Sequence, residues 1–199
     1  MFNLTSKSIL FINLFTTLTL SVANANHNKV NLGAISGGGN GCVNGDLNSY
    51  IDPITGDLIV EPYDYTAIVE NGASFARKSC NISIPFQGIP NRAVRLRQYQ
   101  IKGAVALDTN SSAEINYEVF YSGQRGDAVT LSFFSNNQII EKEFDETIPE
   151  LEIIYSCGKD GIIRSNSSIL VKGGTSSSQV ALAQIQKFGF KIDTVPCDY

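Results

Sequence analysis

The sequence predicts an all-β protein, an antiparallel β-sandwich of the jelly-roll or immunoglobulin-like kind that carries two disulfides. Three observations lead to this prediction. Short runs of alternating apolar and polar residues recur along the chain, separated about every 8–12 residues by Gly, Pro, Asn and Asp clusters. No window keeps an apolar period of 3.6 residues over three helical turns. Four cysteines follow an N-terminal segment that is typical of a signal peptide.

The first 25 residues have the three parts of a signal peptide. Met1–Lys7 carries one positive charge, Ser8–Leu20 is an apolar run, and Ala23-Asn24-Ala25 is a small-residue cleavage site. A retained membrane anchor needs roughly 20 apolar residues, which the run does not supply. We therefore expect residues 1–25 to be removed and 26–199 to form a single β-sandwich domain, secreted or periplasmic, with no membrane insertion.

The charge of the remaining chain excludes some partners. Residues 1–25 hold one lysine and no acid, so the other 174 residues have 14 basic and 19 acidic side chains, a net charge of −5. Nonspecific binding to nucleic acid or to anionic lipid needs a basic surface. We expect neither partner. The sequence carries no signal for an oligomeric state.

The four cysteines are Cys42, Cys80, Cys157 and Cys197. Disulfides persist in exported proteins, and an even number of cysteines favours two bridges, for which three connectivities are possible. We expect Cys42–Cys80 and Cys157–Cys197, one bridge in each half of the chain. A zinc site of four cysteines is disfavoured because no Cys-x-x-Cys pair occurs.

Strands are expected along the first half of the chain at Lys29–Ile35, Leu47–Ile51, Leu58–Tyr63, Tyr65–Val69 and Asn81–Pro85. The segment 52–57, Asp-Pro-Ile-Thr-Gly-Asp, predicts a turn between the second and third of these strands.

The clearest pattern is that of residues 92–121, which predicts a hairpin around Asp108–Ser112. In this register Leu107 lies opposite Ala113, the odd-numbered residues face the core, and Lys102 pairs with Glu118. Upstream the apolar residues fall on even numbers, at Val94 and Leu96. An extra residue near Arg97-Gln98 reconciles the two phases, so a β-bulge is predicted there.

The second half continues as strands, which we expect at 128–134, 138–145, 151–156, 162–171 and 179–193. Asn136-Asn137 favours a tight hairpin between the first two, because Asn tolerates positive φ angles. Gly173–Ser178 is expected to be a loop. In the last strand Phe188, Phe190 and Ile192 share one face.

The order of these landmarks resembles a family of secreted proteins known only as domain of unknown function 4360. The features that carry the resemblance are Gly41-Cys42 after a glycine-rich lead, Arg77-Lys78-Ser79-Cys80-Asn81, Tyr99-x-x-x-Gly103-x-x-x-Leu107, Tyr121-Ser122-Gly123-Gln124, Ser156-Cys157-Gly158 and a cysteine near the C-terminus. The resemblance covers nearly all of the chain after residue 25. It implies an exported, disulfide-containing, β-rich domain, and it implies no catalytic residue.

The residue types give little support to an enzyme. The one histidine, His27, lies two positions past the expected cleavage point, so a Ser-His-Asp or Cys-His centre is excluded. A run of acids could hydrolyse glycosides if two of them were suitably spaced. Its members are Glu141, Glu143, Asp145, Glu146, Glu150 and Glu152. Acids on a strand more often mark a solvated sheet edge, so no catalytic residue is assigned.

Two weaker candidates for binding remain. Tyr50, Tyr63 and Tyr65, with Asp64 between the last two, could form an exposed aromatic patch for a glycan or a protein, although tyrosines more often lie in the core. Asp52 and Asp57 could supply oxygen ligands to calcium, but their segment lacks the ligand density of an EF-hand loop.

The sequence thus favours an exported, non-enzymatic β-sandwich, a binding or interaction module for a glycan or protein at the cell surface. The alternatives are a carboxylate-dependent hydrolase that acts on an extracellular polysaccharide, and a structural domain associated with the envelope.

Overall fold

The strands account for all the regular structure in the described part of the chain. The computed structural model describes residues 30–43, 47–70, 72–148, 153–173 and 180–197. Within these ranges no helix is long and apolar enough to cross a membrane. The strands are β1 (Asn31–Leu32), β2 (Ser36–Gly38), β3 (Leu47–Ile51), β4 (Leu58–Pro62), β5 (Thr66–Val69), β6 (Phe75–Gln87), β7 (Arg92–Leu107), β8 (Ser112–Tyr121), β9 (Val129–Phe134), β10 (Ile140–Ile148), β11 (Ile153–Ile154), β12 (Gly161–Lys172) and β13 (Ala181–Pro196).

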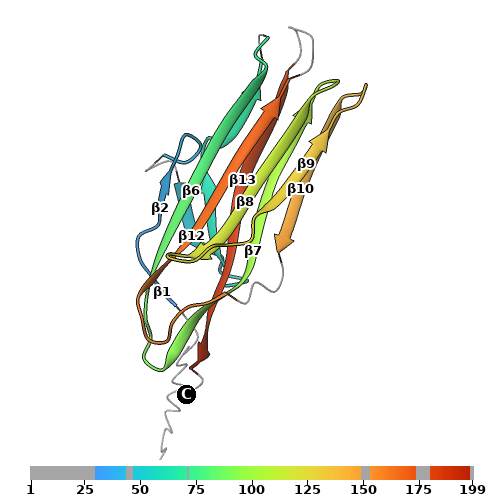
Figure 1. Ribbon diagram of the computed structural model, residues 1–199. Helices are drawn as coiled ribbons and strands as arrows, with labels where there is room; N and C mark the ends of the chain where they lie inside the picture. The colour runs from blue at the N-terminus through green and yellow to red at the C-terminus, as the bar shows by residue number, and fades with distance from the viewer. Residues whose placement is uncertain (1–29, 44–46, 71, 149–152, 174–179, 198–199) are drawn as a thin grey trace, which may run out of the picture.

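The strands form two antiparallel sheets whose long members lie along one common direction (Figure 1). Sheet A has the order β1-β6-β12-β8-β9, with β2 also paired to β6. Sheet B has the order β10-β7-β13-β4-β3, with β11 paired to β7 and β5 to β13. Apolar side chains of both sheets meet between them, so the predicted all-β sandwich is confirmed.

Eight of the strands wind as a jelly roll. From β5 in sheet B the chain crosses to β6 in sheet A, returns to sheet B at β7, and crosses again to β8. It stays in sheet A for β9, moves to sheet B for β10, and ends with β12 in sheet A and β13 in sheet B. Only the β8–β9 connection of this set joins two strands of one sheet. This is the jelly-roll member of the two predicted kinds of sandwich.

For the predicted hairpin of residues 92–121, the strand pairing is wrong, but the prediction of which residues face the core is right. β7 belongs to sheet B and β8 to sheet A, so Leu107 does not pair with Ala113. The odd-numbered apolar residues do point inward on both strands, but they meet across the core. Lys102 instead pairs with Asp145 of β10, with Nζ and Oδ2 2.5 Å apart. Because both side chains are partly exposed, that pair contributes only about 0–1 kcal/mol.

The predicted hairpin at Asn136-Asn137 is wrong for the same reason, since β9 and β10 lie in different sheets. The expected backbone conformation is present, with φ of 45° at Asn137. The two crossings lie side by side: the Asn110 amide donates to the Ser135 carbonyl at 2.7 Å, and the Ser135 amide donates to the Ser111 carbonyl at 3.0 Å. Backbone amides and carbonyls of the two turns therefore supply each other's hydrogen-bond partners.

The predicted β-bulge is confirmed. Gln98 pairs with Lys191 and Leu96 with Ile192, which leaves Arg97 as an extra residue. This extra residue lets both the even-numbered apolar residues before it and the odd-numbered ones after it face the core. A second register shift, which the sequence reasoning did not predict, lies at Gln186 in β13.

Three buried tyrosine hydroxyls, those of Tyr65, Tyr99 and Tyr121, form hydrogen bonds between the two sheets. Tyr99 of β7 shares a 2.7 Å hydrogen bond with Ser165 of β12. The Tyr121 hydroxyl of β8 donates to the Val94 carbonyl of β7 at 2.9 Å. Burial raises the pKa of Tyr99 and of Tyr121 above the usual tyrosine value. Each hydroxyl is satisfied inside the core, which removes most of the cost of burying it.

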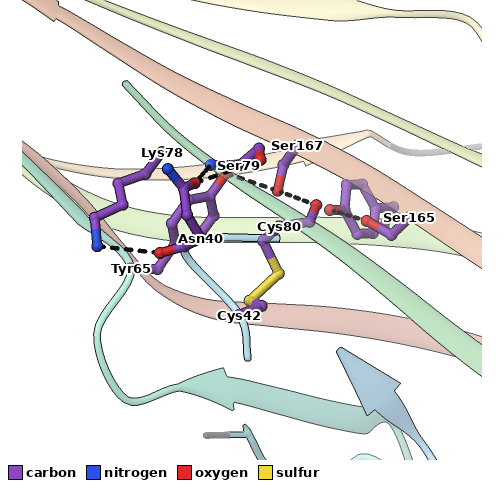
Figure 2. Close-up of a disulfide and its surroundings, with 9 residues drawn as sticks. Asn40, Cys42, Tyr65, Lys78, Ser79, Cys80, Ser165 and Ser167 are labelled. Carbon is purple, nitrogen blue, oxygen red and sulfur yellow. Dashed lines mark hydrogen bonds between the residues drawn. A yellow bond between two sulfur atoms is a disulfide. The ribbon is translucent and has the colours of Figure 1, made fainter. Parts of the chain in front are cut away.

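Both predicted disulfide pairings are present, Cys42–Cys80 and Cys157–Cys197. Cys80 faces the core from β6 and fastens the segment after β2, as Figure 2 shows. Cys197 follows β13 and joins the segment before β12. The bridges close loops with sequence separations of 38 and 40, so each is expected to stabilise the fold by about 4 kcal/mol on the loop-entropy model.

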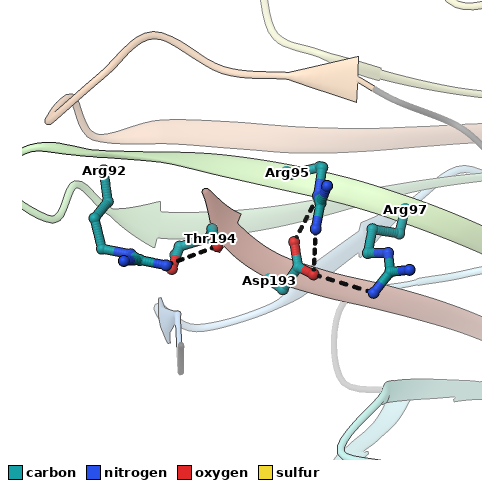
Figure 3. A network of polar contacts seen from close by, with 5 residues as sticks. All are labelled: Arg92, Arg95, Arg97, Asp193 and Thr194. Carbon is teal, nitrogen blue, oxygen red and sulfur yellow. Dashed lines mark hydrogen bonds and ion pairs between the residues drawn. The ribbon is translucent and has the colours of Figure 1, made fainter. Parts of the chain in front are cut away.

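A polar network fastens the end of β13 to β7 (Figure 3). Arg95 donates to both carboxylate oxygens of Asp193 at 2.8 Å, and Arg97 lies 3.5 Å from the same carboxylate. Arg92 donates to the Thr194 hydroxyl at 2.6 Å and to its carbonyl at 2.9 Å. The two-pronged geometry orients β13 where it approaches Cys197.

Candidate binding face

The aromatic patch expected from Tyr50, Tyr63, Asp64 and Tyr65 is wrong in one member. Tyr65 is fully buried, and its hydroxyl donates to Ser167 of β12 at 3.1 Å (Figure 2). Burial raises the pKa of Tyr65. A side chain enclosed between the sheets cannot contact a partner.

The other three residues of that patch are exposed and have different partners. The Tyr50 hydroxyl donates to Glu61 at 3.0 Å, and this hydrogen bond raises the pKa of Tyr50. Asp64 lies 4.0 Å from Lys78 of β6. Tyr63 is 70% exposed between β4 and β5. Because Tyr65 is buried, the exposed residues of the predicted patch do not form a continuous aromatic surface.

The Asp52 carboxylate accepts hydrogen bonds within its own turn. Its Oδ1 accepts hydrogen bonds from the amides of Ile54 at 2.8 Å and Thr55 at 3.3 Å, and these bonds lower the pKa of Asp52. The Asp52 amide donates to the Asp57 carbonyl at 2.8 Å. Over the described ranges no group of three or more His, Cys, Asp or Glu side chains gathers as a metal site would require.

The acidic run forms the edge strand β10 of sheet B. Glu141, Glu143 and Asp145 share its outward face, and all three are exposed. Asp145 accepts a hydrogen bond from Gln100 at 2.7 Å in addition to its pair with Lys102. Glu150 and Glu152 lie outside the described residues. A charged edge strand protects a sheet against pairing with other chains.

A cavity of 670 Å³ lies between β1 and the β3–β4 turn. Its polar groups are used within the protein, since Asn31 donates to Gln87 at 2.7 Å and Asp52 closes its turn. The cavity is also walled by Val30, the first described residue. Although this cavity is large, its lining leaves few polar groups for a ligand, and the surface described next offers more.

The stronger candidate is the outward face of sheet A, which we call the sheet A face. The strand register places its side chains in cross-strand rows over β6, β12, β8 and β9. Two central rows, the floor rows, are polar and mostly short. They consist of Ser79, Ser168, Asn116 and Thr130 in one row and of Asn81, Asn166 and Glu118 in the other.

Over β12 and β8, longer side chains flank the floor rows on both sides. On one side the next row holds Arg77, Leu170, Glu114 and Ser132, and on the other it holds Ser83, Arg164 and Phe120. We call these two rows the wall rows. A depression of 390 Å³ lies over the floor rows and is bounded by Arg77. On β12 and β8 the outward residues change from long to short and back to long along the strand, and the depression lies over the short ones.

Hydrogen bonds order the polar groups of the depression. Asn166 donates to the Glu118 carboxylate at 2.8 Å, and Asn116 donates to the Glu114 carboxylate at 2.8 Å. The Thr130 hydroxyl donates to the Asn116 amide oxygen at 2.5 Å. Each carboxylate is thus held by a neighbouring amide, which fixes the direction of its remaining acceptor positions.

The family model for "Domain of unknown function (DUF4360)" matches residues 28–195 of the chain. The chain belongs to this family. The match covers β1 to β13 except for Pro196, the last residue of β13, and confirms the resemblance drawn from the cysteine and tyrosine motifs. No curated protein matches this DUF4360 chain.

Several solved structures resemble this DUF4360 protein at low identity. TmCBM61 in complex with β-1,4-galactotriose has a TM-score of 0.32 and 10% identity, over 79% of this chain and 87% of that one. The family 11 carbohydrate-binding module from Clostridium thermocellum, in complex with a mixed-linked tetrasaccharide, has a TM-score of 0.25 and 10% identity, over 84% and 91%. The N-terminal cellulose-binding domain of Cellulomonas fimi β-1,4-glucanase C has a TM-score of 0.22 and 11% identity, over 67% and 90%. Similarity at this level transfers no ligand to the DUF4360 chain.

Sequence reasoning missed the sheet A face. One strand of this face is β12, whose run Arg164–Ser168 is polar on both faces. The inward Ser165 and Ser167 bond to core tyrosines, whereas the outward Asn166 and Ser168 line the depression. Without the strand register, these two roles look alike in the sequence.

Proposed function

We propose that this DUF4360 protein is an exported, non-enzymatic binding module whose ligand is a glycan, held on the sheet A face. The observation that carries the proposal is the depression over the floor rows, where hydroxyl, amide and carboxylate groups lie in register across four strands. A sugar hydroxyl both donates and accepts hydrogen bonds, and these side chains offer both roles at close spacing. The two disulfides fit an exported protein.

The composition of the face favours a glycan over a protein partner. The centre of a protein–protein interface is enriched in aromatic and apolar residues and depleted of short polar ones. The floor rows have the opposite composition. Aromatic rings occur around them instead, at Phe120 in a wall row and at Phe75 and Phe134 farther along the same face. Such rings can stack on the apolar face of a sugar while the floor bonds its hydroxyls.

The carboxylates of this face are placed for binding rather than hydrolysis. Glu114 and Glu118 lie four residues apart on β8, a distance of about 13 Å along a strand. Paired acids that hydrolyse glycosides are set about 5–9.5 Å apart. In addition, each of the two carboxylates accepts a hydrogen bond from an asparagine.

The proposal is tested with the protein recovered from an exporting host, on a glycan array and then by titration calorimetry with the array's best ligand. We expect Asn166→Ala to weaken binding at least tenfold, since it removes a floor amide and frees Glu118. Gln184→Ala is the matched control, because Gln184 is a partly exposed amide on the outward face of sheet B. Circular dichroism verifies that both variants fold. Absence of binding across the array, or equal loss from both variants, would refute the proposal.

A further inference from the structure

The depression has an orientation, because its floor and walls follow the rows of sheet A. The floor rows run across the strands, from Ser79 and Asn81 on β6 to Thr130 on β9. The wall rows run parallel to them, two residues before and two after along β12. Long wall residues bound the floor on both sides over β12 and β8. The trough between them is long across the strands and narrow along them.

The floor row that holds Asn81 and Asn166 continues onto a neighbouring strand at one end. Gly38 of β2 pairs with Asn81, on the same outward side. A Cβ placed on Gly38 would meet no atom within 4 Å, so the space above it is open. The adjacent Gly39 differs, since its φ of 99° and the Ser79 carbonyl both require glycine. Gly38 is therefore not explained by backbone conformation or by crowding.

The other end of the same row also carries a short side chain. Ala128 directly precedes β9, is exposed, and lines the depression together with Glu118. The row thus begins at a glycine and finishes at an alanine, the two smallest side chains. No long side chain of the row closes either end in the described part of the sheet.

The trough is longer than one sugar. From Gly38 to Ala128 the row crosses β2, β6, β12 and β8 and reaches the residue before β9, and four spacings of about 4.8 Å give a length of about 19 Å. A single ring would occupy only part of this length, whereas an extended chain could bond to the floor at each strand it crosses.

We propose that the trough binds an internal stretch of a linear glycan, which lies across the strands of sheet A and leaves past Gly38 at one end and Ala128 at the other. This inference rests on the proposed function and adds to it the shape and direction of the ligand. The protein selects a polymer over free sugars and over chain ends, because contacts accumulate along the trough and neither end is closed.

The test uses soluble galactan, mixed-linkage glucan, xylan and pectate, with oligomers of each from the disaccharide upward, titrated against the exported protein. For the polymer that binds, we expect the affinity per site to rise at least tenfold from the disaccharide to the longest oligomer. Reduction of the terminal sugar to its alditol is expected to leave binding of the long oligomers unchanged.

Two variants narrow the ends of the trough. Gly38→Gln and Ala128→Gln are each expected to weaken polymer binding at least tenfold and to change disaccharide binding less than twofold. Ser36→Gln is the matched control, because Ser36 lies on β2 and on the same face but next to Ser83 in a wall row. The use of both ends keeps the test valid if one variant does not fold.

The outcomes separate the inference from the proposed function. Absence of binding to all four polymers and to the glycan array would remove the proposed function. Binding that is equally tight for a disaccharide and the polymer, that is lost on capping the chain end, or that is unchanged by both glutamine variants would overturn the trough alone.

Discussion

The oxygens of Tyr99 and Ser165 lie 2.7 Å apart in the middle of the core and join β7 of sheet B to β12 of sheet A. Both side chains are fully buried. Because either oxygen is costly to leave without a partner in this position, the pair fixes how the two sheets are placed relative to each other.

Tyr99→Phe is expected to lower the free energy of unfolding by about 1–3 kcal/mol, because Ser165 then lacks the tyrosine hydroxyl. Adding Ser165→Ala to this variant is expected to recover part of the loss, since both polar partners are then absent. Urea unfolding of the two single variants and the double variant measures the coupling. Strictly additive losses would show that the hydrogen bond contributes nothing.

The buried tyrosines predict unfolding at high pH. Burial raises the pKa of Tyr65, Tyr99 and Tyr121 in the folded protein, whereas an unfolded tyrosine titrates near pH 10. The unfolded state therefore loses protons first as the pH rises. Stability is intact below about pH 10 and falls above it, by up to about 4 kcal/mol per pH unit for three such groups.

Phenolate absorbance and far-ultraviolet circular dichroism check this expectation in parallel. Tyr65, Tyr99 and Tyr121 are expected to ionise in one step together with loss of the β signal. Ionisation of these three tyrosines while the β signal is retained would contradict it.

The sequence specified which residues face the core but not which strands pair. Alternation in β7 and β8 placed Leu107 and Ala113 inward, and both are buried. A turn that crosses between sheets has the same short polar residues as a hairpin turn, so the pattern could not separate the two. The neighbours of β7 are β10 and β13, both far along the chain, and local sequence holds no record of these pairings.

The candidate face depended on contacts that are distant in sequence. Tyr65 could be placed in the core only through Ser167, which lies 102 residues away. Asn81 and Asn166 become neighbours only through the β6–β12 register. By contrast, a β-bulge near Arg97-Gln98 could be predicted because the phase change on either side of it is local, and the extra residue is Arg97.

The bulge gives a prediction with a built-in control. Deletion of Arg97 leaves Leu96 two positions before Tyr99, so ordinary alternation turns Val94, Leu96 and Tyr99 to the core without a bulge. Arg97→Ala keeps the bulge and removes only a half-exposed ion pair with Asp193, so it is expected to cost under about 1 kcal/mol. The deletion is expected to cost little more than this substitution. A urea midpoint for the deletion far below that of Arg97→Ala would contradict this reading of the bulge.

Asp52 tests the calcium prediction. Because its Oδ1 already accepts two amide hydrogen bonds in the turn, adding calcium or a chelator is expected to leave the Tm unchanged. Asp52→Ala is expected to lower the Tm in the presence and absence of calcium alike. A calcium-dependent rise in Tm that Asp52→Ala abolishes would instead establish a metal site at this turn.

The two disulfides are expected to differ in how readily they are reduced. Cys42 and Cys80 are fully buried, whereas Cys157 and Cys197 are partly exposed. Because thiol–disulfide exchange requires direct attack on a sulfur atom, a mild reductant is expected to open Cys157–Cys197 first while the sandwich remains folded. Timed alkylation and peptide mapping identify the first cysteines to react, and the same reaction in denaturant, where both bridges are accessible, provides the control. Early labelling of Cys42 and Cys80 in the folded protein would mean that the segment after β2 opens more readily than the end of β13.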